Sequence, residues 1–209
     1  MTISGPKRPA PRTPPVGDAH DDSAQDSFQQ RIFPGWRWVA VALAFPIAGF
    51  IGWKVDGRVN AVDAALVGGA LTGAGLGAVQ WWAADGALGR AAAWIGASTV
   101  GYAGGLAAGA ALAGYDTNLG ALALMGLVSG AVLGGAQGLL LAHGGYRGLA
   151  LVWAVAMPAL FALGWIATSA VGVSVENQFT VFGAAGAILF MLLSGLLLTR
   201  FTPARAQLA

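Results

Sequence analysis

The stretch GALTGAGLGAVQWW at residues 69–82 decides the fold, because its pattern returns twice later in the chain. Steps of four, four and three residues separate three glycines and a glutamine: Gly69, Gly73, Gly77 and Gln80. This spacing keeps the four residues on one side of an α-helix. The stretch GLVSGAVLGGAQGL at residues 126–139 repeats the same spacing 57 positions later, with Gly126, Gly130, Gly134 and Gln137. A weaker third copy, GAAGAILFMLLSGL at residues 183–196, has Gly183 and Ser194 at its two ends.

A second type of helix alternates with the first and carries a Trp eleven residues before a Gly. The three pairs are Trp38 with Gly49, Trp94 with Gly105, and Trp153 with Gly164. This alternation predicts three helical hairpins of one design. We expect them to form a pseudo-threefold bundle, with the repeat helices 62–84, 119–143 and 178–200 nearest its axis.

The composition places the chain in a membrane. Of 209 residues, 56% are hydrophobic, only 10% are charged and 33 are glycine, whereas soluble domains carry about a quarter charged residues. A helix needs about 20 apolar residues to cross the hydrocarbon core. Six blocks approach or exceed that length: residues 36–53, 62–84, 91–113, 119–143, 148–171 and 178–199. The sequence therefore predicts an all-α polytopic membrane protein with six transmembrane helices.

The basic residues predict the orientation of these helices. If both termini lie on one side, that side gathers nine basic residues: Lys7, Arg8, Arg12, Arg31, Arg37, Arg90, Arg147, Arg200 and Arg205. Only Lys54 and Arg58 remain on the other side. Since cytoplasmic loops carry the excess of Lys and Arg, both termini are expected in the cytoplasm, below a bacterial inner membrane.

Three regions are predicted along the chain. Residues 1–30 are rich in Pro, Asp, Ser and Gln, and are expected to form a disordered cytoplasmic tail. Residues 31–200 form the six-helix transmembrane domain, and residues 201–209 form a second short cytoplasmic tail. The short outer connections place Asn60, Asn118 and Asn177 before the repeat helices, where Asn is a good N-cap.

The glycine face predicts close helix packing. Small residues at every fourth position allow two helix backbones to approach within a membrane. We expect the glycine faces of the first two copies to meet, with Gln80 and Gln137 joined by an interhelical hydrogen bond worth roughly 1 kcal/mol. The same region supplies a candidate polar notch in the helix packing: Gln80, Gln137, Ser194, Thr72 and Ser129. This notch is either polar support for a packing seam or the lining of a pathway or ligand pocket.

The spans hold no acidic or basic residue at depth, which weighs against catalysis and proton-driven transport. A hydrolase would require a base beside its nucleophile, and none lies near the hydroxyl residues of the spans. There are no cysteines, and neither histidine has a partner at metal-ligand spacing. We therefore expect a non-enzymatic protein with no cofactor, no metal and no nucleic-acid partner.

The run from Gly69 to Trp82, Gly-x-x-x-Gly-x-x-x-Gly-x-x-Gln-Trp, resembles repeats in bacterial multi-pass membrane proteins that carry no assigned activity. The resemblance covers the first copy well, the second without its Trp, and the third weakly. It implies a glycine-rich helical bundle. Six spans in three hairpins also suggest mitochondrial carriers, but the signature motif and long loops of that family are absent.

Two functions remain open from the sequence. The first is an accessory or scaffold subunit of an inner-membrane complex, which acts by helix–helix association with other subunits or with a second copy. The second is a small transporter or pore, or a binding protein, for an uncharged or hydrophobic solute. Helix 178–199, dense in Phe, Leu, Ile and Met, is expected to face lipid or a partner.

Overall fold

The computed structural model describes residues 35–85 and 87–201, so the predicted tail 1–30 and nearly all of the tail 201–209 lie outside the described residues. Within the described ranges, the regular secondary structure is entirely helical. The α-helices are α2 (Gly35–Asp56), α3 (Val62–Ala83), α4 (Ala91–Leu112), α5 (Leu119–His143), α6 (Arg147–Ala170) and α7 (Ala184–Phe201). One short 3₁₀ turn, η1 (Val175–Asn177), precedes α7.

The five helices from α2 to α6 are long and apolar enough to cross a membrane, which indicates a multi-pass membrane protein. Their bounds agree with the predicted spans to within about three residues at each end. The apolar part of α7, Ala184–Leu198, is shorter. At 1.5 Å per residue the 18 residues of α7 reach about 27 Å, slightly less than the ~30 Å hydrocarbon core.

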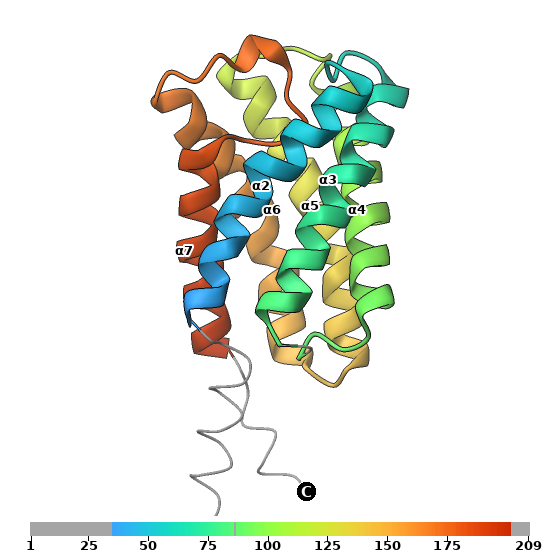
Figure 1. The fold of residues 1–209 in the computed structure, drawn as a ribbon, viewed down its shortest axis with the longest axis vertical. Coiled ribbons are helices and arrows are strands. Elements are labelled where there is room, and N and C mark those ends of the chain that lie inside the picture. Colours follow the sequence, from blue (N-terminus) through green and yellow to red (C-terminus); the bar gives the residue numbers. More distant parts are fainter. Residues whose placement is uncertain (1–34, 86, 202–209) are drawn as a thin grey trace, which may run out of the picture.

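The helices form a single bundle (Figure 1), and the contacts between them follow one another in a closed ring from α2 to α7. Each helix packs mainly against its neighbours in the chain, and α7 packs against both α6 and α2. The beginning of α2 and the end of α7 lie at the same end of the bundle. The contacts therefore give the three repeat helices no separate inner layer, and the expectation that they lie nearest the axis stays a prediction.

The turn between α5 and α6 depends on a glycine. After α5, Gly145 adopts a left-handed conformation with φ 91°. The turn then returns hydrogen bonds to the helix end, from Gly145 N to Ala142 O and from Tyr146 N to Leu141 O. This arrangement closes the helix within two residues and lets α6 begin at once, antiparallel to α5.

The predicted sixth span is wrong over its first six residues. Residues 178–183 are not helical, and Gln178 has a left-handed φ of 50°. The segment runs down into the bundle before α7 begins (Figure 1). Its polar groups find partners elsewhere in the chain: Val59 N, in the connection from α2 to α3, donates to Gln178 O at 3.0 Å, and Tyr102 Oη of α4 donates to Thr180 O at 2.6 Å. Tertiary hydrogen bonds thus replace the intrahelical bonds that the apolar pattern implied.

An aromatic cluster fills the space enclosed by the helices. Phe45 lies 4.7 Å, between ring centroids, from both Phe182 and Phe190, and Phe161 lies 5.4 Å from Phe182. Tyr102 adds a fifth ring, 5.5 Å from Phe161. All five side chains are buried, and together they come from α2, α4, α6, α7 and the segment before α7. The interior at this level is therefore packed.

Candidate functional site

The polar centre of the molecule is built on two glutamines. Gln80 of α3 and Gln137 of α5 are both fully buried, and Gln137 Nε2 donates to Gln80 Oε1 at 2.9 Å. This is the interhelical hydrogen bond expected from the repeat. Gln137 Nε2 also donates to Ser98 Oγ at 2.9 Å, and Ser98 in turn donates to Trp94 O at 2.8 Å. Both protons of the Gln137 amide are therefore used.

Three tryptophans surround this centre and donate to the same position of each repeat copy. Trp94 Nε1 donates to Gln80 Oε1 at 3.3 Å, and Trp153 Nε1 donates to Gln137 Oε1 at 2.8 Å. In the third case, Trp38 Nε1 of α2 donates to Ser194 Oγ of α7 at 3.3 Å. The three donor–acceptor pairs therefore join α3 to α4, α5 to α6, and α7 to α2.

The two glutamines are not equivalent. Gln137 has partners for both its oxygen and its nitrogen, whereas Gln80 Nε2 is buried without a hydrogen-bond partner. Ser129 Oγ, also predicted in the polar notch, is buried without a partner as well. An unpartnered buried donor costs free energy, so the network is satisfied more fully around Gln137 than around Gln80.

The remaining notch residue, Thr72, belongs to a separate polar group nearer the other end of α3. Its Oγ1 lies 2.8 Å from Thr180 Oγ1 and donates to Gly68 O at 2.8 Å. Thr180 Oγ1 also donates to Gly49 O at 3.1 Å. The predicted notch is thus divided into three hydrogen-bonded groups, around the two glutamines, Ser194 and Thr72, with Ser129 outside all of them.

The glycine faces pack against different helices from those expected. An added Cβ at Gly69 would lie 2.9 Å from Ala103 Cα of α4, and one at Gly126 would lie 2.8 Å from Phe161 O of α6. The other repeat glycines follow the same rule: Gly73 and Gly77 contact α4, and Gly130 and Gly134 contact α6. The prediction that the two faces meet each other is therefore wrong. Each glycine face accommodates the tryptophan-bearing helix that follows it.

In the third copy of the repeat, the first glycine does not pack a repeat helix against the helix that follows it. Gly183 lies just before α7 and not within it, and its nearest side chain is Thr168 of α6. Thr168 Oγ1 accepts a hydrogen bond from Gly183 N at 3.0 Å. The outward assignment of helix 178–199 is also wrong in part, because Phe182, Ala187 and Phe190 are fully buried.

Sequence reasoning did not assign Ser98, Tyr102 and Thr180 to the site. Ser98 had a detectable signal, since it lies one helical turn after Trp94 and so shares its face. Tyr102 lies a further turn along on the same side. Thr180 had no such signal, because its position depends on the non-helical path of residues 178–183.

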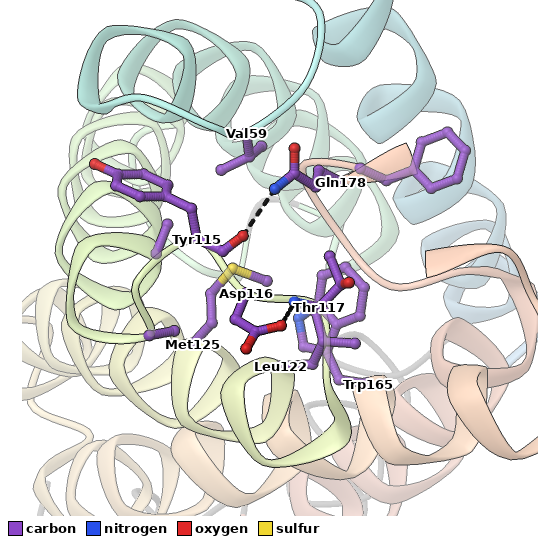
Figure 2. Close-up of a pocket in the computed structure, with 11 residues that line it drawn as sticks. Val59, Tyr115, Asp116, Thr117, Leu122, Met125, Trp165 and Gln178 are labelled. Carbon is purple, nitrogen blue, oxygen red and sulfur yellow. Dashed lines mark hydrogen bonds between the residues drawn. The ribbon is translucent and has the colours of Figure 1, made fainter. Parts of the chain in front are cut away.

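A shallow pocket lies at the end of the bundle opposite the described chain ends. Figure 2 shows its lining, which includes Val59, Met125, Trp165 and the loop from Tyr115 to Thr117. Gln178 Nε2 donates to Tyr115 O at 2.8 Å across this pocket. The space holds about one water molecule. This pocket is therefore too small for an organic solute.

Asp116, on the rim of that pocket, organises the start of α5. The pKa of its carboxyl is lowered because the backbone N–H groups of Asn118 and Thr117 donate to it. Asn118 then caps α5 by accepting from Ala121 N at 2.9 Å, as predicted. The same prediction is wrong for Asn60 and Asn177, because Ala61 stands at the start of α3 and Asn177 lies within η1.

The chemistry available at the polar centre is that of neutral hydrogen bonding. Its members are amides, indoles and hydroxyls, with no titratable carboxylate, amine or imidazole. Among the described residues, no three His, Cys, Asp or Glu side chains come together to hold a metal ion. At the membrane edge, Asp85 pairs with Arg37 at 2.7 Å.

Comparison of the chain with protein-family models, with curated protein sequences and with solved structures finds no match in any of the three.

Proposed function

We propose that this protein is a non-enzymatic accessory subunit of a membrane complex, and that it acts by packing one outer helix face against a transmembrane helix of another subunit. The observation that carries the proposal is a pair of outward glycines on α4. An added Cβ at Gly96 or at Gly104 would meet nothing within 4 Å. Neither glycine therefore has a packing role within residues 35–85 and 87–201.

These glycines form part of a regular outer face. Gly96, Val100, Gly104 and Ala108 follow one another at every fourth position, and Val100 is 74% exposed. The opposite face of α4 is already used, because Gly101, Gly105 and Gly109 contact α5. A glycine within a helix costs about 1 kcal/mol relative to alanine. Close approach of a second helix backbone gives the outer glycines a function that offsets this cost.

The packed interior favours this role over transport. The predicted notch residues Gln80, Gln137, Ser194 and Thr72 are buried and take part in hydrogen bonds, and the aromatic cluster occupies the axis. A solute path along that axis would require these groups to separate. Transport of an uncharged or hydrophobic solute is therefore the second candidate.

We further propose a pseudo-threefold design of three helix pairs, α3–α4, α5–α6 and α7–α2, set in a bacterial cytoplasmic membrane with both termini inside; the first two pairs are hairpins, and the third joins the last described helix to the first. The three tryptophan hydrogen bonds to equivalent repeat positions support this pairing. The turns that lead into α4 and α6, at Arg90 and Arg147, lie at the same end of the bundle as the described chain ends, which fits the positive-inside rule.

The test is native mass spectrometry after extraction in a mild detergent or polymer. The wild-type chain should carry a bound protein, either another subunit or a second copy. The double variant Gly96→Leu with Gly104→Leu should lose that protein, because two leucines hold the helices apart.

The matched control is Gly148→Leu on α6, since Gly148 is also exposed with no neighbour within 4 Å. It should retain the bound protein, and all three chains should share one thermal midpoint. A wild-type chain that is always a lone monomer would refute the proposal. Retention of the partner by the double variant would place the interface elsewhere.

A further inference from the structure

The wall of the bundle is incomplete beside the start of α7. Because α7 begins only at Ala184, the non-helical segment 178–183 runs where the missing helical turns would stand. A single non-helical chain is thinner than a helix, so it leaves space beside the middle of α2. The result is a side cavity at this point in the wall.

The cavity has a volume of about 200 Å³ and an almost wholly apolar surface. Its lining combines the middle of α2 with the chain that leads into α7: Pro46, Gly49, Phe50, Val173, Phe179, Val181, Phe182 and Gly183. A dry cavity of about 150 Å³ with aliphatic and aromatic walls takes up benzene and not water. A cavity of this size and lining therefore suits a hydrocarbon.

The cavity opens toward the outer surface of α2. Ile47, Phe50 and Ile51 are each at least half exposed on that surface, and Phe50 is also part of the cavity wall. In a membrane this surface contacts acyl chains. An acyl chain can therefore enter the cavity from the side, directly from the lipid, without crossing any polar layer.

A positive charge stands next to the cavity, one helical turn after Phe50. Lys54 Nζ lies 5.4 Å from the centroid of the Phe50 ring and 5.2 Å from that of Trp53. Trp53 Nε1 donates to Asn177 O at 3.1 Å, and this bond joins the end of α2 to η1, just before residues 178–183. An ammonium group at the end of an apolar slot matches a lipid phosphate attached to an acyl chain.

We propose that the side cavity binds one phospholipid of the outer leaflet, with an acyl chain in the slot and the phosphate beside Lys54. Neither a second copy nor a partner helix is required. A transmembrane helix is too wide for a slot of this volume, and neither supplies the phosphate that Lys54 fits. This site is distinct from the α4 face, so the two can be tested separately.

The probe is phosphatidylglycerol with a photoreactive diazirine near the middle of one acyl chain, in phosphatidylcholine vesicles that contain the full-length protein. After illumination, labelled peptides are mapped by mass spectrometry. We expect labels at Gly49, Phe50 and residues 179–183. Labels confined to outward residues such as Leu43 and Ile47 would overturn the proposal.

Two variants test separately whether the cavity binds the acyl chain and whether Lys54 binds the phosphate. Val173→Trp should fill the slot and reduce labelling of residues 179–183 by about tenfold. Val171→Trp is the matched control, since Val171 lies on the same loop, is 63% exposed and does not line the cavity; labelling should be unchanged. Lys54→Gln should lower labelling by phosphatidylglycerol more than labelling by a matched phosphatidylcholine probe.

Equal labelling of wild type and Val173→Trp would refute the site. So would a crosslink between two copies formed by a Val173→Cys variant in place of lipid labelling. A change in thermal midpoint identifies a misfolded Val173→Trp chain, and in that case the Lys54→Gln comparison decides alone.

Discussion

Gln80 and Gln137 occupy the same place in two copies of a repeat, yet their surroundings give them different energetic roles. Gln137 takes part in three hydrogen bonds, to Gln80, Ser98 and Trp153. Gln80 accepts two, and its amide nitrogen has no partner. Bonds of this type in membrane proteins contribute about 0.6 kcal/mol each on average.

We therefore predict that Gln137→Leu is the more costly change. It should lower the free energy of unfolding by about 2 kcal/mol, because it also leaves the Trp153 indole N–H buried without a partner. Gln80→Leu also takes the acceptor from a buried indole, that of Trp94, but this bond is longer at 3.3 Å. It should cost about 1 kcal/mol, since it removes two hydrogen bonds where Gln137→Leu removes three, and it also removes an unpartnered donor. Reversible unfolding by SDS in mixed micelles measures both values. Equal losses, or a larger loss at Gln80, would contradict the described network.

At the scale of single helices, the glycine pattern predicted close packing but not the partner of each face. A spacing of four residues shows which residues share a face. It does not show which neighbour that face meets, because both adjacent helices in a ring are available. In the structure each glycine face meets the helix that follows it, α4 for α3 and α6 for α5.

The structure predicts opposite outcomes for two glycines on α5. An added Cβ at Gly130 would lie 2.8 Å from Pro158 Cα of α6, whereas one at Gly135 would meet nothing within 4 Å. Gly130→Ala should therefore destabilise by about 1–3 kcal/mol through overpacking. Gly135→Ala should be neutral or stabilise by up to about 1 kcal/mol. Thermal unfolding of the two variants side by side provides the measurement, and a loss of stability at Gly135 alone would reverse the assignment of inner and outer faces.

The helices themselves were largely predictable, and the exception is informative. Five predicted spans match α2 to α6, since long apolar blocks have few alternatives in a membrane. The sixth prediction is wrong over residues 178–183, although only Gln178 and Thr180 among them are polar. Their path depends on Gly49 and Gly68, which leave room for Val181 and Thr180. Such long-range pairings leave no local trace in a single sequence.

At the scale of the whole molecule, the ring depends on contacts between the first and last described helices. Trp38 with Ser194, and Phe45 with Phe190, join α2 to α7 across most of the chain. The two open ends of these helices lie at the same end of the bundle (Figure 1). The molecule thus resembles a closed cycle of helices with a single break in its backbone.

A circular permutant should therefore fold. A flexible linker would join the end of α7 to the start of α2, and new termini would open the turn between α3 and α4. We expect a thermal midpoint within a few degrees of that of the native chain, because every helix keeps its neighbours and its orientation across the membrane. A permutant opened between Phe179 and Thr180 is the control, since it places two charged termini inside the bundle and should not fold. Failure of the first permutant would show that the α2–α7 contact does not hold the ring closed.

The non-helical path of residues 178–183 has a consequence for how the chain is made. A non-helical segment cannot enter lipid alone, because its peptide groups would lose water without gaining partners. Its partners, among them Tyr102 and Thr72, belong to helices synthesised much earlier. The segment and α7 must therefore insert against helices that are already in place, and not into lipid alone. Membrane insertion would therefore end in a distinct late step. Until α7 and the segment before it have packed, one side of α2 has no protein neighbour.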